Sequence, residues 1–163
     1  RCLRDLKELG YQVGTGFMVG SPWQTMANLL EDLAFIRELQ PQMIGIGPFI
    51  PHHATPLKNY PAGTLEQTLT LLSVLRLMFP KVLLPATTAL GTIVPNGREL
   101  GILAGANVVM PNLSPADVRQ NYLLYDNKLC SGAEAAEAKN DLAARLHSIG
   151  YEIAEGRGDY KES

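Results

Sequence analysis

The sequence predicts an α/β protein whose strands run parallel. Four short apolar segments alternate with helical patterns over residues 1–113. The apolar segments contain few polar residues, which is typical of parallel strands buried on both faces. Because the strand–helix unit repeats four times, the pattern is half of an eight-unit (β/α)8 barrel of TIM type. A small doubly wound α/β domain fits the same pattern.

The first predicted strand is residues 11–19 (YQVGTGFMV), and a helix follows it. Ser21 is predicted as the N-cap of this helix, with Pro22 at the first helical position and Gln24 closing a capping box. Apolar residues then recur at helical spacing until Pro41 ends the helix. The segment therefore predicts one complete strand–helix unit.

Three further strands follow in the same alternation. The helix after the second strand begins with a predicted capping box of Thr64 and Gln67, and Pro80 ends it. Another helix is predicted around residues 98–103. The three strands are predicted at residues 43–50, 82–84 and 107–110.

The last third of the chain has a different character. An Ala-rich amphipathic helix is predicted over residues 133–149, with Gly150 as its C-cap glycine. We therefore expect two parts, with residues 1–113 forming half of a barrel and residues 114–163 forming a helical extension packed on it. The chain starts at Arg1 within a helical pattern, which indicates a piece of a longer protein.

The composition excludes several classes of protein. The 163 residues are 46% hydrophobic and 18% charged, with a formal net charge of −2 and no basic patch that would track a phosphate backbone. No apolar run approaches the roughly 18 residues of a membrane-spanning helix. Cys2 and Cys130 are too few for a disulfide framework and are expected as reduced thiols. We expect a cytoplasmic globular protein that binds neither nucleic acid nor membrane.

In a parallel barrel, functional residues gather at the C-terminal ends of the strands. Thr87 and Thr88 follow the third predicted strand there, and their hydroxyls and amides suit a carboxylate or other small anion. Ordinary turn chemistry is the alternative for this pair. Glycines also interrupt the first two strands, which marks close approach of a ligand or of another backbone, or tight strand–helix packing. These glycines are Gly14, Gly16, Gly20, Gly45 and Gly47.

His52 and His53 form an adjacent pair of potential metal ligands. Adjacent residues point in different directions, and no neighbouring Cys, Asp or Glu completes a ligand set. We therefore expect a solvated loop here and no metal site. The sequence also lacks a Ser-His-Asp order, an HExxH motif and a P-loop. Spacing and composition alone predict half of an α/β barrel with an open, partly polar face.

Five long segments are far more specific than any short motif. Together they resemble the HydE family of FeFe-hydrogenase maturases, in the biotin-synthase-like group of radical S-adenosylmethionine (SAM) enzymes. The likeness runs from about residue 8 to residue 158. The segments are residues 14–22 (GTGFMVGSP), 46–51 (IGPFIP), 84–91 (LPATTALG), 101–113 (GILAGANVVMPNL) and 124–128 (LYDNK).

The resemblance implies a radical SAM barrel whose strands five to eight lie in this chain. It implies cleavage of SAM by a 4Fe-4S cluster to a 5'-deoxyadenosyl radical, during assembly of the two-iron subcluster of the hydrogenase H-cluster. Other hydrogenase maturases are the implied partners, and a small molecule or small iron complex is the implied substrate. By position, the SAM-binding residues are Met18, Pro48 and Ile50. The substrate-binding residues are Thr87 and Thr88, which hold the anionic end, with Met43, Met110 and Tyr122.

The chain departs from the family in its cysteines. The C-x3-C-x2-C motif that binds the family's 4Fe-4S cluster lies outside this chain, so the fragment alone is expected to be inactive. Some members bind an accessory cluster through C-x7-C-x2-C near the C-terminus. Cys130 matches the first position here, but Ala138 and Asp141 stand at the other two. Because one thiolate cannot hold an Fe–S cluster, we expect no accessory cluster.

Two other functions are compatible with the same resemblance. A methylornithine-synthase-like mutase or a biotin-synthase-like sulfur-inserting enzyme belongs to the same group. A non-catalytic carrier would hold an iron complex for other maturases without cleaving SAM. The cavity-lining arginines and carboxylates of the other half of the barrel would discriminate between the enzymes.

Overall fold

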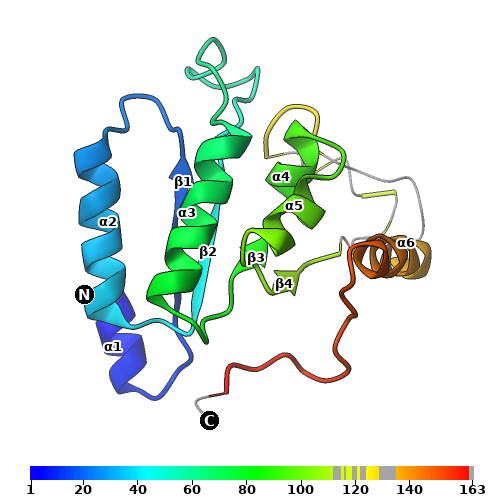
Figure 1. Ribbon diagram of the computed structural model, residues 1–163. Helices are drawn as coiled ribbons and strands as arrows, with labels where there is room; N and C mark the ends of the chain where they lie inside the picture. The colour runs from blue at the N-terminus through cyan, green and yellow to red at the C-terminus, as the bar shows by residue number, and fades with distance from the viewer. Residues whose placement is uncertain (112–114, 116, 119–120, 122–123, 129–134, 162–163) are drawn as a thin grey trace.

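The computed structural model of the chain describes residues 1–111, 115, 117–118, 121, 124–128 and 135–161. Strands and helices alternate along the first two thirds of the chain (Figure 1). The strands are β1 (Gly14–Val19), β2 (Met43–Pro48), β3 (Pro85–Ala86) and β4 (Val108–Val109). The helices are α1 (Cys2–Glu8), α2 (Met26–Leu39), α3 (Leu65–Met78), α4 (Thr88–Ile93), α5 (Gly97–Leu103) and α6 (Ala135–Ser148).

The four strands lie in sequence order and run parallel. β1 pairs with β2 along its whole length, and β3 pairs with β4. A parallel bridge between Met43 and Leu83, with a hydrogen bond of 2.9 Å from Ile44 N to Leu83 O, joins β2 to the segment that leads into β3. The predicted α/β class with parallel strands is therefore confirmed. β1, β2 and β4 are shorter than predicted, and β3 begins at Pro85, directly after the predicted range of residues 82–84, where Leu83 makes only an isolated bridge to Met43. Closure into a barrel stays a prediction.

Helices α2, α3 and α5 pack on one face of these strands. α3 lies in front of β2 in Figure 1, while α2 and α5 contact β1 and β3. Burial alternates along β2, because Ile44 and Ile46 are buried under the helices whereas Met43, Gly45 and Gly47 are partly exposed on the other face. The prediction that both faces are buried is thus wrong for β1 and β2, whereas both residues of β3 are buried. Their second face lines a cavity instead.

The hydrophobic core fills the space between strands and helices. Each fully buried aliphatic side chain contributes roughly 1.5–3 kcal/mol to folding. Leu142 and Leu146 of α6 belong to the same core, so the last helix packs against the strand–helix units. The most deeply buried aliphatic residues are Val19, Ile36, Ile44, Ile46, Leu72, Leu75, Leu84 and Leu90.

Helix α2 begins later than the sequence predicted. Its N-cap is Thr25, whose side chain accepts a hydrogen bond of 3.3 Å from Asn28 N, while the Asn28 side chain accepts one of 2.9 Å from Thr25 N. Trp23 has φ = 65°, which is incompatible with a helical turn at residues 22–24. The predicted N-cap at Ser21 is therefore wrong.

The other helices agree more closely with the sequence pattern. Thr64 is the N-cap of α3, as predicted, and accepts a hydrogen bond of 3.2 Å from Gln67 N. Helix α6 lies within the predicted range, and Gly150 beyond it has φ = 83°. Helix α4 was not predicted. No helix among the described residues is long and apolar enough to span a membrane.

Candidate functional site

The uncovered face of the strands lines a cavity of about 1350 Å³. Its walls come from β1, β2, the loop after β2 and the first turn of α4. Parallel strands present their C-terminal ends at one edge of a sheet, so the loops that follow them meet there. The cavity is larger than the roughly 300–1,000 Å³ of a pocket for one small ligand. It therefore has space for a cofactor and a second small molecule.

Seven of the eight predicted site residues line this one cavity. Tyr122, the eighth, lies outside the described residues. The structure thus brings together side chains from β1, β2, the loop after β2, α4 and the end of β4, although their individual roles stay predictions. The seven residues are Met18, Met43, Pro48, Ile50, Thr87, Thr88 and Met110.

A side-chain bridge fixes the end of β1, which carries Met18 to the cavity. The Gln24 side chain accepts a hydrogen bond of 2.7 Å from Gly20 N and donates one of 2.8 Å to Met18 O. Gln24 therefore closes the turn after the strand, in place of the capping box predicted for it. The bridge positions the backbone on either side of Val19, which is fully buried.

Thr87 brings an unpaired polar atom to the cavity wall. It is the N-cap of α4 but makes no side-chain capping bond. Its Oγ1 is buried and has no hydrogen-bond partner among the described residues. Because an unpaired buried hydroxyl costs about 1–3 kcal/mol, such an atom marks a place where a ligand or water completes the hydrogen bonding.

A buried cation lies behind Thr88. The guanidinium of Arg98 donates a hydrogen bond of 3.3 Å from Nη2 to Thr88 Oγ1. Arg98 is only 8% exposed, and burial together with the charge of Arg145 lowers its pKa. An arginine remains protonated in proteins. The Thr87–Thr88 end of the cavity therefore has positive charge beneath it, which favours an anionic group.

The same region holds an ion pair that fixes α6. Glu99, beside Arg98 in α5, pairs with Arg145, and a second hydrogen bond of 2.9 Å joins Arg145 Nη2 to Glu99 Oε2. Burial would raise the pKa of Glu99, but the hydrogen bond from Arg145, one from its own backbone and both guanidinium charges outweigh it and hold the pKa low. Sequence reasoning missed Arg98. The feature that could have indicated it is the pair of adjacent charged residues, Arg98 and Glu99, within an otherwise apolar helix.

The cavity rim contains residues that the sequence did not single out as site residues. They include His52, Thr55, Tyr125 and Lys128. The expectation of a His52–His53 pair without a nearby carboxylate is wrong. The two rings stack at 4.4 Å, and Asp126 lies 2.7 Å from His53 through its Oδ1 and the histidine Nδ1. The carboxylate lies 73 residues further along the chain, so no local pattern indicates it.

The glycines of β1 and β2 differ in what surrounds them. A Cβ at Gly16 would overlap the backbone of Gly45 on the neighbouring strand, so close backbone approach requires glycine there. A Cβ at Gly47 would lie 2.7 Å from Thr87 Oγ1. A Cβ at Gly45 would meet no atom within 4 Å, so that position opens directly into the cavity.

Three curated proteins are similar to the chain, whereas no protein-family model matches it. It is 52% identical to the [FeFe] hydrogenase maturase subunit HydE of Thermotoga maritima over 129 residues, which is 79% of this chain and 37% of that protein. It is 34% identical to 3-methylornithine synthase of Methanosarcina barkeri over 126 residues, 77% of this chain and 35% of that protein. It is 28% identical to 3-methylornithine synthase of Methanosarcina acetivorans over 151 residues, 93% of this chain and 41% of that protein.

The chain spans little more than a third of the length of the curated relatives it matches. Its small parallel sheets and the large cavity beside them are consistent with a partial radical SAM fold. The chain is the C-terminal part of a HydE-like radical SAM protein. The resemblance found in the sequence is thereby confirmed.

Proposed function

We propose that this chain is part of a radical SAM enzyme that cleaves SAM to a 5'-deoxyadenosyl radical during assembly of the two-iron subcluster of the FeFe-hydrogenase H-cluster. In this proposal residues 1–113 are strands five to eight of a (β/α)8 barrel, and residues 114–163 are an extension packed on it. The identity to HydE and the parallel order of the strands support it. The observation that carries it is the convergence of seven family-matched residues on one cavity.

The cavity fits SAM next to a second molecule. Met18, Pro48 and Ile50 form its mostly apolar wall, which suits an adenine ring and a thioether-like chain. If SAM were bound here, one electron from the cluster would break its C5'–S bond, which would release methionine and supply the 5'-deoxyadenosyl radical. The protein's own contribution here is to hold both molecules in contact and to exclude water from the cavity.

None of the described residues that line the cavity is a cysteine. The described part of the cavity wall therefore offers no thiolate with which to hold a 4Fe-4S cluster beside SAM. We propose that the cluster ligands form a C-x3-C-x2-C motif elsewhere in the protein, and that this chain alone does not cleave SAM. Cys130, the one match to an accessory-cluster motif, lies outside the described residues.

Thr87 and Thr88 are proposed to bind the anionic end of the substrate. The unpaired hydroxyl of Thr87 and the charge of Arg98 behind Thr88 support this role. Met43 and Met110 would line the cavity around the rest of the substrate, which is a small molecule or a small iron complex. Partner maturases would supply or receive it.

The test uses the full-length protein, with its cluster reconstituted under anaerobic conditions and a reductant added. We expect 5'-deoxyadenosine to form in the presence of SAM. If SAM is neither bound nor cleaved, the protein is a carrier and the enzyme proposal is lost. Activation of hydrogenase apoprotein, in the presence of the other maturases, then tests the maturase assignment.

The anion-binding role has its own test in the Thr87→Val, Thr88→Val double variant. We expect hydrogenase activation to fall at least about tenfold, because a hydrogen bond to a charged group contributes about 1.5–3 kcal/mol. SAM affinity should remain unchanged. Thr92→Val, on the same helix but outside the cavity, is the matched control. Equal loss of SAM affinity and activation in the double variant would contradict the assignment.

The similarity to two 3-methylornithine synthases favours one alternative, a mutase of the same group. The same reconstituted protein discriminates between the two functions. A mutase would form 3-methylornithine and would leave hydrogenase apoprotein inactive. Lower identity to the synthases than to HydE makes this the second candidate.

A further inference from the structure

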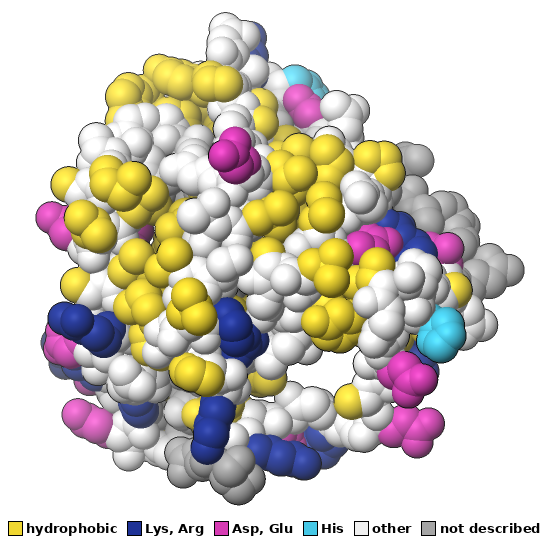
Figure 2. Space-filling view, in the orientation of Figure 1, with side chains coloured by type: hydrophobic (Ala, Val, Ile, Leu, Met, Phe, Trp, Pro, Cys, Tyr) yellow, Lys and Arg dark blue, Asp and Glu magenta, His cyan; other side chains and the backbone are white. Residues whose placement is uncertain are grey.

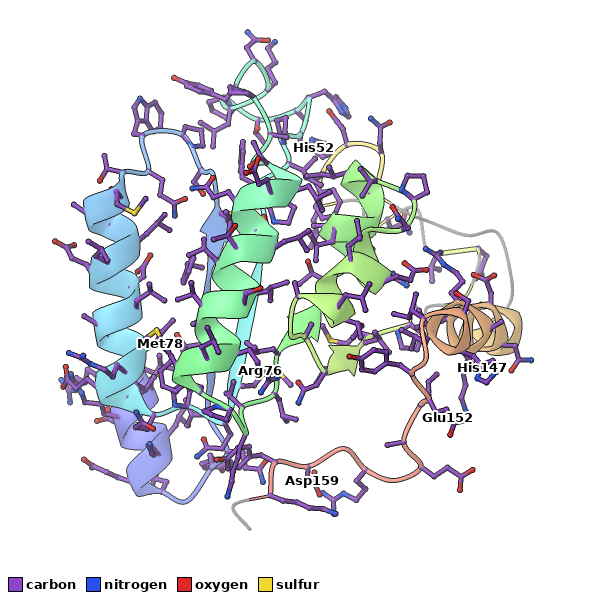
Figure 3. All side chains as sticks on the ribbon, viewed as in Figure 1. His52, Arg76, Met78, His147, Glu152 and Asp159 are labelled. Carbon is purple, nitrogen blue, oxygen red and sulfur yellow. The ribbon has the colours of Figure 1, made fainter. Side chains whose placement is uncertain are left out.

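Two histidines and one aspartate form a cluster at the cavity rim that the proposed radical chemistry does not use. The rings of His52 and His53 stack with an interplanar angle of 24°. One potential ligand atom from each histidine and one from Asp126 lie within 4.8 Å of one another. Figure 3 places His52 at the upper end of the molecule, and Figure 2 shows histidine surface beside an acidic side chain in that region.

The carboxylate of Asp126 is fixed by the histidine segment. Its Oδ2 accepts a hydrogen bond of 2.8 Å from His53 N, and its Oδ1 lies 2.7 Å from His53 Nδ1. The backbone N of Asp126 donates to Pro51 O at 3.1 Å. The hydrogen bonds from His53 hold the pKa of Asp126 below its ordinary value. A charged carboxylate is therefore fixed beside two imidazoles.

Each imidazole can present a lone pair once it gives up one existing hydrogen bond. Nδ1 of His52 accepts a hydrogen bond of 3.0 Å from Ala54 N, so that nitrogen carries no proton. Nδ1 of His53 shares a proton with Asp126 Oδ1, and a metal ion can replace that proton. Ligand atoms at about 2.0–2.2 Å from a tetrahedral metal are separated by about 3.4 Å. His53 Nδ1 and Asp126 Oδ1, now 2.7 Å apart, therefore need only a small separation to admit the ion. His52 has only to rotate toward them, and to release one backbone hydrogen bond.

The donor set selects the kind of metal. Two imidazole nitrogens and one carboxylate suit divalent first-row transition metals, whereas Mg²⁺ and Ca²⁺ prefer oxygen ligands alone. We propose that His52, His53 and Asp126 form a binding site for a Zn²⁺- or Fe²⁺-class ion at the mouth of the cavity. Three protein ligands leave coordination positions open to water or to a small molecule. His52 also lines the cavity, so such a molecule can lie within it.

The proposal is independent of the function proposed above, and direct metal binding tests it. The full-length protein, with its cysteine-bound cluster already assembled, is titrated with Zn²⁺ and with Co²⁺ in calorimetric and absorption experiments. We expect one further equivalent to bind, with the visible absorption of Co²⁺ in a nitrogen-containing site. Mg²⁺ should not compete.

Single substitutions locate the ion. His53→Ala and Asp126→Asn should each weaken Zn²⁺ binding at least about tenfold, since even partners outside the ligand set change affinity by about 10–100-fold. Asp126→Asn keeps the shape of the side chain and an oxygen acceptor, so it removes mainly the charge. His147→Ala is the matched control, because His147 is an exposed residue of α6, away from the cluster (Figure 3).

Two results would contradict the proposed metal site. Wild-type affinity in both His53→Ala and Asp126→Asn overturns the proposal, as does loss of binding in His147→Ala. Circular dichroism and thermal melting of each variant establish that it is folded. 5'-Deoxyadenosine formation, measured on the same samples, shows whether the radical function is present, so a failure of that function is distinguishable from a failure of the metal site.

Discussion

Gly47 of β2 lies directly against Thr87 at the N-terminus of α4. A Cβ at position 47 would be 2.7 Å from Thr87 Oγ1 and 3.5 Å from the Thr87 Cβ. Both residues line the cavity. The missing side chain at position 47 therefore provides the space in which the unpaired Thr87 hydroxyl lies.

Gly47→Ala should destabilise the protein and displace the Thr87 side chain. We expect a loss of about 1–3 kcal/mol in the free energy of unfolding, the usual cost of overpacking. Urea unfolding measures it. Gly45→Ala is the matched control on the same strand and face, because its Cβ would meet nothing within 4 Å. An equal cost for both substitutions would show that strand geometry, and not Thr87, requires glycine at position 47.

Arg98 is predicted to act on the substrate through Thr88. Arg98→Met removes the buried charge behind the Thr87–Thr88 pair, and we expect hydrogenase activation by the full-length protein to fall about tenfold. Arg98→Lys keeps a charge and should recover part of it. SAM cleavage without substrate is the internal reference, because Arg98 does not line the SAM wall. A parallel fall in both activities would indicate a purely structural role.

Much of the fold and site follows from the order of residues along single elements. Alternating strand and helix patterns predict parallel strands, and strand ends predict where the cavity residues lie. Four predicted site residues line one cavity because each lies at or just beyond the C-terminal end of a strand. They are Met18, Ile50, Thr87 and Met110. The resemblance to HydE supplied the choice among these positions.

Features that depend on distant contacts could not be predicted in this way. Asp126 meets His53 across 73 residues, and Arg98 meets Thr88 between two helices whose packing the sequence does not display. The sequence did not predict that only one face of β1 and β2 is buried. Glycine and methionine occur both in a hydrophobic core and in the wall of an apolar cavity, so their presence does not distinguish the two. The start of α2 was missed because the left-handed backbone of Trp23 has no sequence signature.

Substitutions at Thr25 and Ser21 test which of the two residues caps α2. Thr25→Ala should lower the free energy of unfolding by about 1 kcal/mol, because the orphan amide of Asn28 loses its acceptor. Ser21→Ala should change it by less than about 0.5 kcal/mol, as a surface substitution away from a cap. The same urea experiment measures both. A larger effect at Ser21 than at Thr25 would restore the cap position that the sequence predicted.

The contact between Glu99 and Arg145 is predicted to couple α5 to α6. Arg145→Met should cost about 2 kcal/mol, less than the roughly 3–5 kcal/mol of breaking a fully buried pair, because Arg145 keeps part of its side chain in solvent. Glu99→Gln with Arg145→Met should cost less than the sum of the two single variants. The measurement is the free energy of unfolding of the wild type, the two single variants and the double variant, which together form a double-mutant cycle. Strict additivity would show that the pair does not couple the helices.

The same pair predicts how stability depends on pH. The folded-state pKa of Glu99 lies below its value in the unfolded chain, so the unfolded state binds the proton more readily. The stabilisation is therefore complete above the unfolded pKa of about 4.3 and is lost as the pH falls through the lower folded value. Arg145→Met removes the main hydrogen bond that lowers this pKa. The difference in unfolding free energy between wild type and Arg145→Met should thus be largest near pH 7 and should shrink progressively below about pH 4. A difference that stays constant from pH 7 to pH 3 would mean that Arg145 stabilises α6 through packing of its aliphatic stem instead of through the charge of Glu99.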